Sequence, residues 1–156
     1  MKAVILAGGL GTRMREETEF KPKPMVEIGG KPILWHIMKI LSSQGIHEFV
    51  ICLGYRGRDI KRYFLDLPAM NNDFSIRIGK EPTIYSQESQ PLEDWHVTLV
   101  DTGDLTPTAG RILAVRQFLQ GEPFLLTYGD GIADIDLKAL QKKHDELKTA
   151  VTITTT

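Results

Sequence analysis

The chain has 156 residues, which is enough for one packed domain and too few for two of ordinary size. Its 19 basic and 20 acidic side chains give a formal net charge of -1, which excludes a general attraction to nucleic acid or to an acidic membrane surface. With 42% hydrophobic residues, and no stretch near the ~20 apolar residues of a membrane helix, we expect a globular protein of the cytoplasm.

Strands and helices are predicted to alternate in the first half of the chain. Short apolar runs that end at glycine are typical of buried parallel strands, and apolar residues three or four positions apart are typical of helices. These patterns predict strands at 2–6 and 48–54, a helix from Pro32 to just before Gly45, and a helix from Ile60 to Pro68, where the missing N–H should stop it. Cys52 lies within the second strand, which favours a buried apolar role over a catalytic one.

The second half continues the alternation after a region that is hard to assign. Residues 69–95 contain two candidate short strands, FSIRIG and TIYSQ, and give no firm assignment. Beyond them, the patterns predict strands at 96–103 and 123–130, a helix holding Ile112, Val115, Arg116 and Leu119, and a helix capped by Asp134 or Asp136 that holds Leu137, Leu140 and Leu147. The β-branched residues at 150–156 are strand-like.

This order of elements predicts the fold class. Strands that alternate with helices indicate an α/β fold, here a Rossmann-like three-layer domain with a mostly parallel sheet and helices on both faces. Sheets of this kind bind ligands beyond the carboxyl ends of their strands. The residues that follow each predicted strand are therefore the first place to look for a site.

The segment LAGGLGTR (6–13) directly follows the first strand and is predicted to bind phosphate. Gly8, Gly9 and Gly11 lack the β-carbons that would keep a polyphosphate away from the backbone N–H groups. Thr12 adds a hydroxyl, and Arg13 can bind two phosphate oxygens. The spacing fits neither the dinucleotide fingerprint nor a P-loop. A glycine-rich turn with exposed charges is the alternative.

A second basic segment, FKPKPM (20–25), follows the glycine loop. Its prolines fix φ and bias the preceding residues toward extended geometry, which predicts that Lys21 and Lys23 are held on a stiff segment. Such a lysine loses little freedom when it contacts a reacting phosphate. The alternative is a solvated proline loop.

Asp130 is the candidate metal ligand. It follows the strand FLLTY between Gly129 and Gly131, at the sheet edge where the glycine loop is also expected. A carboxylate beside a polyphosphate would be repelled unless a cation lay between them, so we predict that Asp130 binds Mg²⁺ shared with phosphate oxygens. The alternative is an Asx-type turn.

Taken together, LAGGLGTR and KPKPMVEIGGKPILWHIMK, with VTLVDTG, GRI and TYGDG further on, resemble the sugar-phosphate nucleotidyltransferases. The resemblance runs from Met1 to about Asp136, is weakest at 69–95, and is closest to members that use CTP and glucose 1-phosphate. It implies Mg²⁺-dependent transfer of a cytidylyl group from CTP to α-D-glucose 1-phosphate, giving CDP-glucose and pyrophosphate. The product would supply CDP-linked deoxysugars of surface polysaccharide, such as the O-antigen of lipopolysaccharide.

The resemblance also implies roles for individual residues. Arg13 would neutralise the departing pyrophosphate, and Lys23 would contact the reacting phosphate. In GDLTPTAGR, Thr106 and Arg111 would face the cytosine or its ribose, although Thr108 could simply cap a helix. The implied nucleotide-binding set is Leu6, Ala7, Gly8, Gly9, Leu10, Gly11, Thr12, Arg13, Lys23, Thr106, Arg111 and Gly129, with Asp130 as the metal ligand.

Members of this family continue well past residue 156, with a sugar pocket and a second aspartate for the metal. We therefore expect 1–156 to be a single nucleotide-binding and catalytic domain that lacks the sugar-binding part, belongs to a homo-oligomer, and turns over poorly or not at all alone. Three alternatives stay open. They are transfer of another base or to another sugar, a non-catalytic nucleotide-binding module, and a structural α/β domain without a ligand.

Overall fold

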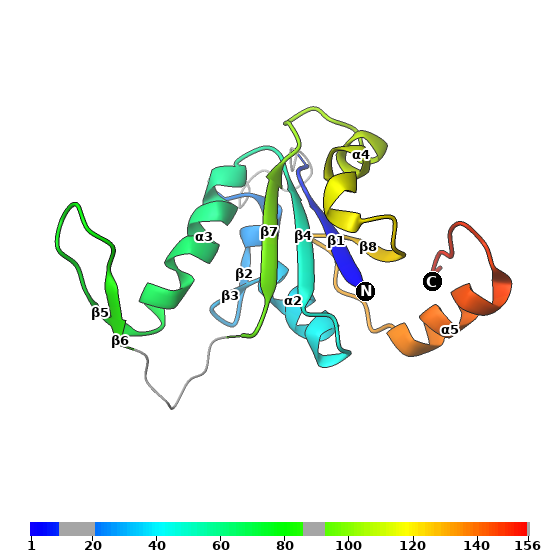
Figure 1. Cartoon of the computed structure of the whole chain (residues 1–156), viewed down its shortest axis with the longest axis horizontal. Helices are drawn as coiled ribbons and strands as arrows, with labels where there is room; N and C mark the ends of the chain where they lie inside the picture. The colour runs from blue at the N-terminus through cyan, green and yellow to red at the C-terminus, as the bar shows by residue number, and fades with distance from the viewer. Residues whose placement is uncertain (10–20, 86–92, 156) are drawn as a thin grey trace.

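A computed structural model describes residues 1–9, 21–85 and 93–155. Its centre is a four-stranded parallel sheet in the order β7-β4-β1-β8 (Figure 1). The strands are β1 (Lys2–Ala7), β4 (Glu48–Leu53), β7 (His96–Asp101) and β8 (Phe124–Tyr128). All four match predicted strands, and because they run parallel, their carboxyl ends lie at one edge of the sheet.

The central strands are buried on both faces. Along β1, Ala3, Ile5 and Ala7 pack into one core while Val4 and Leu6 pack into another. This follows from the alternation of side chains along a strand. An apolar run without polar interruption is therefore what a strand between two helical layers requires.

Helices cover the two faces (Figure 1). On one face lie α2 (Ile33–Ser43), α3 (Gly57–Met70) and α5 (Leu137–Leu147), and on the other lies α4 (Thr108–Leu119). The predicted three-layer α/β fold is therefore confirmed. In the part of the chain that the structure describes, no helix has the length and apolarity needed to cross a membrane.

Helix α3 passes through Pro68, so the prediction that this proline stops it is wrong. The proline lies in the last turn, where one missing N–H removes only one backbone bond. The side-chain amides of Asn71 and Asn72 then donate to the carbonyls of Leu67 and Pro68, at 2.6 and 2.8 Å. The helix end is thereby satisfied two residues beyond the proline.

Several short elements lie outside the main sheet. The 3-10 turn η1 (Lys23–Met25) is followed by a small antiparallel pair, β2 (Glu27–Ile28) and β3 (Lys31–Pro32). Within the unassigned region, β5 (Asp73–Ser75) and β6 (Thr83–Tyr85) form an antiparallel hairpin that projects beyond α3 in Figure 1. Strands this short carry too little periodic pattern to be assigned from sequence.

The carboxyl-terminal elements settle two further predictions. Asp136 is the N-cap of α5, since its side chain accepts a bond from the Ala139 N–H at 3.0 Å. The strand predicted at 150–156 is wrong for the described residues 150–155, which form no strand. A β-branched composition favours a strand only where a neighbouring backbone pairs with it.

Candidate active site

The carboxyl edge of the sheet brings four chain segments together. β1 leads into Gly8, β4 into Gly54, β7 into Thr102 and β8 into Gly129. From β1 the chain builds outward through β4 to β7 and then returns to β8 on the opposite side of β1. The gap between the ends of β1 and β8 is therefore the topological switch point, where sheets of this type bind ligands.

Gly129 joins the ends of β1 and β8. Its N–H donates to the Leu6 carbonyl at 2.9 Å. A β-carbon at position 129 would lie 3.2 Å from Cγ of Pro24 and 3.3 Å from the Leu6 oxygen. The absence of a side chain at Gly129 thus allows η1 to pack against the end of β1.

This packing brings Lys23 to Asp130. The ammonium Nζ of Lys23 lies 3.9 Å from Oδ2 of Asp130, with the two side chains 23% and 42% exposed. The two residues come from distant parts of the sequence, and each was predicted to act on the same phosphates. The structure therefore places the predicted cation and the predicted carboxylate at one point of the sheet edge.

The proline-rich segment has a different shape from the one predicted. Pro22 is extended, but Lys23 begins a 3-10 turn in which the Met25 N–H donates to the Pro22 carbonyl at 2.8 Å. Lys21 is turned toward Glu27, with Nζ 2.7 Å from Oε1. The two lysines are therefore not held on one stiff segment, and only Lys23 contacts Asp130.

Arg111 is one of two buried polar or charged residues among those described, the other being Thr102. Nη1 of its guanidinium donates to the Leu53 carbonyl at 2.9 Å and to Oγ1 of Thr102 at 2.7 Å. Nη2 donates to the carbonyls of Gly8 and Asp104 at 2.8 and 3.1 Å. The side chain therefore connects the end of β4 with the segments that follow β1 and β7.

The glycines around this guanidinium explain its place. A β-carbon on Gly8 would overlap the Arg111 guanidinium, and one on Gly54 would lie 2.8 Å from Nη1. Gly8 thus makes room for an arginine, whereas the sequence suggested room for phosphate. A β-carbon on Gly9 would meet nothing within 4 Å among the atoms described, so Gly9 fits the predicted open approach.

Gly54 and Thr102 were missed by the sequence reasoning. A signal was present, because glycine directly follows β1, β4 and β8. Glycine at the end of a buried strand often marks a close approach of other atoms. The atoms that approach Gly54 could not be predicted, since Arg111 lies on another element.

Thr106 lies close to Gly103 in the segment after β7 and to Gly110 in the first turn of α4. Its Oγ1 would lie 2.8 Å from a β-carbon on Gly103, and its Cγ2 would lie 2.8 Å from one on Gly110. α4 begins at Thr108 with Pro107 in the N-cap position, so Thr108 is the first helical residue and not the cap. The contacts of Thr106 and Arg111 with a base stay predictions.

The remaining predicted nucleotide-binding residues divide into two groups. Leu6 and Ala7 are buried in β1, and the Leu6 carbonyl accepts from the Gly129 N–H. The described ranges do not include Leu10, Gly11, Thr12 and Arg13. Their roles in phosphate binding stay predictions.

The exposed carboxylate of Asp130 fits one kind of Mg²⁺ site, in which the metal is shared with a bound ligand. Mg²⁺ is a hard cation that keeps several waters and takes one or two carboxylates together with phosphate oxygens. Across residues 1–9, 21–85 and 93–155, no group of three or more His, Cys, Asp and Glu is arranged to hold a metal. These residues therefore suit a metal shared with a bound triphosphate better than one enclosed by protein.

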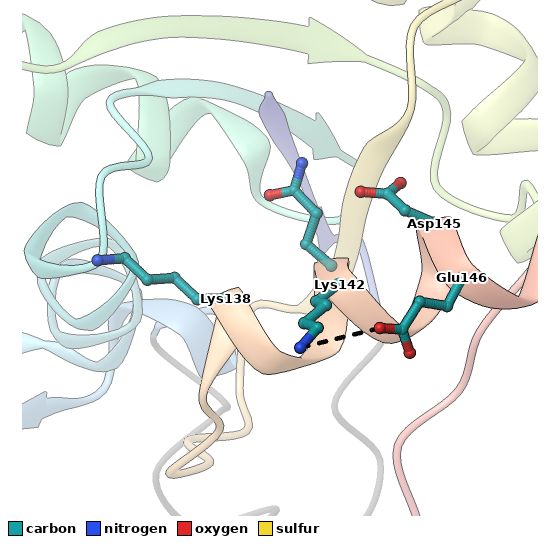
Figure 2. A pocket seen from close by; sticks show the side chains of 5 residues that line it. Lys138, Lys142, Asp145 and Glu146 are labelled. Carbon is teal, nitrogen blue, oxygen red and sulfur yellow. Dashed lines mark ion pairs between the residues drawn. The ribbon is translucent and has the colours of Figure 1, made fainter.

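A depression on α5 provides a contrast to the sheet edge (Figure 2). It is lined by Lys138, Gln141, Lys142, Asp145 and Glu146. These side chains come from a single helix, and Lys142 and Glu146 are paired at 3.9 Å. Its two basic and two acidic residues balance in charge, so we do not place the phosphate site there.

Comparison with known proteins gives the family of this chain. The family described as "Nucleotidyl transferase" matches residues 2–156. The chain belongs to this family. It is 51% identical over 157 residues to the glucose-1-phosphate cytidylyltransferase of Salmonella typhimurium (strain LT2), covering 100% of this chain and 60% of that protein. It is 49% identical to the probable glucose-1-phosphate cytidylyltransferase of Bacillus subtilis (strain 168), covering 99% and 59%.

A solved structure supports the fold assignment of this nucleotidyl transferase chain. HddC from Yersinia pseudotuberculosis, in complex with GMP-PN, matches with a TM-score of 0.66 and 26% sequence identity, covering 92% of this chain and 53% of HddC. The chain spans about 60% of the length of the curated relatives named above. The family resemblance seen in the sequence is confirmed.

Proposed function

We propose that the protein carrying this sequence transfers the cytidylyl group of CTP to α-D-glucose 1-phosphate, giving CDP-glucose and pyrophosphate. The observation that carries the proposal is the meeting of Lys23 and Asp130 at the β1–β8 edge, 3.9 Å apart. The names of the relatives at 51% and 49% identity support the choice of base and sugar. The proposal includes the predicted use in CDP-linked deoxysugars of surface polysaccharide, and a homo-oligomer in the cytoplasm.

The reaction is a phosphoryl-centred displacement that needs no general base. An oxygen of the sugar phosphate, already ionised at neutral pH, attacks the α-phosphorus of CTP, and the bond to pyrophosphate breaks. Lys23 stabilises charge on the reacting phosphate, while Arg13 and the glycine segment hold the leaving group. Mg²⁺, when bound by Asp130 and phosphate oxygens, would neutralise part of the triphosphate charge.

Base choice is assigned to the segment after β7. Thr106 is held in place between Gly103 and Gly110 and is proposed to face the cytosine. The main alternative function is the same chemistry with another base. HddC, which is 26% identical to this chain, was solved in complex with the guanine nucleotide GMP-PN. Calorimetric binding of CTP, UTP, dTTP and GTP, each with and without Mg²⁺, separates these readings. Preference for a nucleotide other than CTP would count against the cytidylyl assignment.

The first prediction concerns the two basic side chains. In the full-length protein, Lys23→Ala and Arg13→Ala should each lower kcat by on the order of 10²-fold or more, because each removes a preorganised charge from the transition state. The measurement is pyrophosphate release from CTP and glucose 1-phosphate.

Lys21→Ala is the matched control, since Lys21 lies in the same segment but pairs with Glu27. It should keep near-wild-type turnover. A folded Lys23→Ala variant with unchanged kcat would refute the assignment of Lys23. CTP binding without any turnover in the full-length protein would favour the non-catalytic nucleotide-binding module.

A further inference from the structure

Arg111 has an unusual environment for a charged side chain. It is 6% exposed, and its four hydrogen bonds go to three backbone carbonyls and one hydroxyl. Burying a charge is costly unless it is well bonded. Because all four acceptors must stay in place for these bonds to form, the guanidinium and the acceptors at the ends of the strands hold one another in position.

The terminal donors of this guanidinium are fully used. A guanidinium has five N–H groups, of which the two terminal nitrogens carry four. Those four go to Leu53, Thr102, Gly8 and Asp104. Within the described residues the four terminal N–H groups are therefore all used, so direct reading of a cytosine by the forked end of Arg111 would require breaking one of these bonds.

The two acceptors of Nη2 belong to segments with different proposed tasks. Gly8 opens the segment proposed to bind the triphosphate, and its carbonyl accepts from Nη2 at 2.8 Å. Asp104 lies in the segment that holds Thr106, proposed to face the base, and its carbonyl accepts from the same nitrogen at 3.1 Å. One nitrogen atom therefore joins the two segments.

The socket around the guanidinium is shaped for this planar group. The guanidinium occupies the space that β-carbons at positions 8 and 54 would need, so both positions require glycine. Oγ1 of Thr102 accepts from Nη1 and also donates to the Leu53 carbonyl at 2.6 Å. A lysine would keep the charge but could not reproduce the fork, because its donors radiate from one atom.

We propose that Arg111 is a positioning residue that sets the distance between the base subsite and the triphosphate subsite. The proposal rests on the proposed function, because it takes the glycine segment as the phosphate site and Thr106 as the base site. A ligand that occupies both subsites, such as CTP, depends on their spacing. A ligand that occupies one of them, such as pyrophosphate, does not.

The test compares CTP and pyrophosphate binding to the full-length protein by calorimetry. Arg111→Lys and Thr102→Val should each lose on the order of 10-fold or more in CTP affinity, while pyrophosphate affinity stays within about 2-fold. Thr102→Ser keeps the hydroxyl and should restore CTP affinity. Arg116→Lys, on the exposed face of the same helix, is the control for α4 and should match wild type.

Each result decides between roles. If Arg111→Lys does not fold, Thr102→Val and Thr102→Ser carry the comparison. Equal loss of CTP and pyrophosphate affinity would mean that Arg111 shapes the phosphate segment itself and not its distance from the base subsite. A lower Tm with unchanged affinities would mean a purely structural role. Either outcome overturns the positioning role while leaving the proposed function in place. Absence of CTP binding by the unsubstituted protein would instead count against the proposed function.

Discussion

At the scale of single residues, Gly129 shows how a missing side chain positions a charged one. A methyl group there would press on Pro24 at 3.2 Å and on the Leu6 carbonyl at 3.3 Å. Pro24 belongs to the turn that carries Lys23, so Gly129→Ala should shift Lys23 from its place beside Asp130. We expect kcat to fall by on the order of 10-fold or more, because small misplacements of reacting groups are costly.

Gly131→Ala is the matched control for this second prediction. A β-carbon at position 131 would meet nothing within 4 Å among the atoms described. Both variants are assayed by pyrophosphate release, with Tm as the check on folding. Equal kcat values for the two variants would show that contact with Pro24 does not position Lys23.

Residue types were predictable here, but their partners were not. The sequence indicated that position 8 needs glycine, and it assigned the space to phosphate. The structure fills it with the guanidinium of Arg111, which is 103 positions away in the sequence. The reason is physical: a local pattern reports what the backbone needs, whereas the atom that fills a space arrives from another element.

At the scale of elements, Asp136 illustrates a helix start that could be narrowed to two candidates. Its side chain accepts from the Ala139 N–H at 3.0 Å and so satisfies one free donor of α5. The same helix start is also bonded to the side chain of Gln44, which follows α2. Its Nε2 donates to the Ile135 carbonyl at 3.0 Å, and its Oε1 accepts from the Leu137 N–H at 2.9 Å. Helix α5 therefore depends on one cap and one side-chain tether at its first turn.

The third prediction is that Asp136→Ala lowers the free energy of unfolding by about 1 kcal/mol, the usual loss for an N-cap. Asp134→Ala is the control, because Asp134 lies before the cap position and should change stability by less than about 0.5 kcal/mol. Urea unfolding followed by circular dichroism measures both. Equal losses would show that the cap bond does not contribute.

Elements with several turns or with long apolar runs were predicted firmly, apart from the end of α3, whereas the short strands β5 and β6 could only be named as candidates. The apolar runs of β1 and β4 and the repeated apolar spacing of α2 are long enough to indicate a strand or a helix. Strands β5 and β6 have three residues each and gain their pairing from each other. For such segments, pairing in space decides the structure.

At the scale of the whole molecule, the buried thiol of Cys52 makes the free energy of unfolding depend on pH. Burial raises the pKa of its thiol from 9.0 to about 11, and the positive charge of Arg111 opposes this more weakly. Between these values the unfolded chain loses the proton while the folded chain keeps it. The resulting stability is fully present below pH 9 and is lost as the pH rises toward 11. Burial, and then the charge of Glu27, raise the pKa of Tyr63 in the same direction.

The fourth prediction is a fall in the free energy of unfolding on the order of 2 kcal/mol between pH 9 and pH 11 from this thiol. Urea unfolding at several pH values measures it. Cys52→Ala should make the decline shallower, since it removes one of the two groups. If the free energy of unfolding falls equally with pH in wild type and Cys52→Ala, ionisation of the thiol does not cause the decline.

The sequence by itself determined the alternation of strands and helices, the family, and the residue types at the ends of β1 and β8. These are local properties, because each depends on backbone preference or on spacing within one segment. Only the tertiary structure decided that Lys23 meets Asp130, that Arg111 fills the space beside Gly8, and that residues 150–155 form no strand. Those outcomes depend on which distant segments pack together, and packing is set by the strand order and by the buried surfaces on both sides of the sheet.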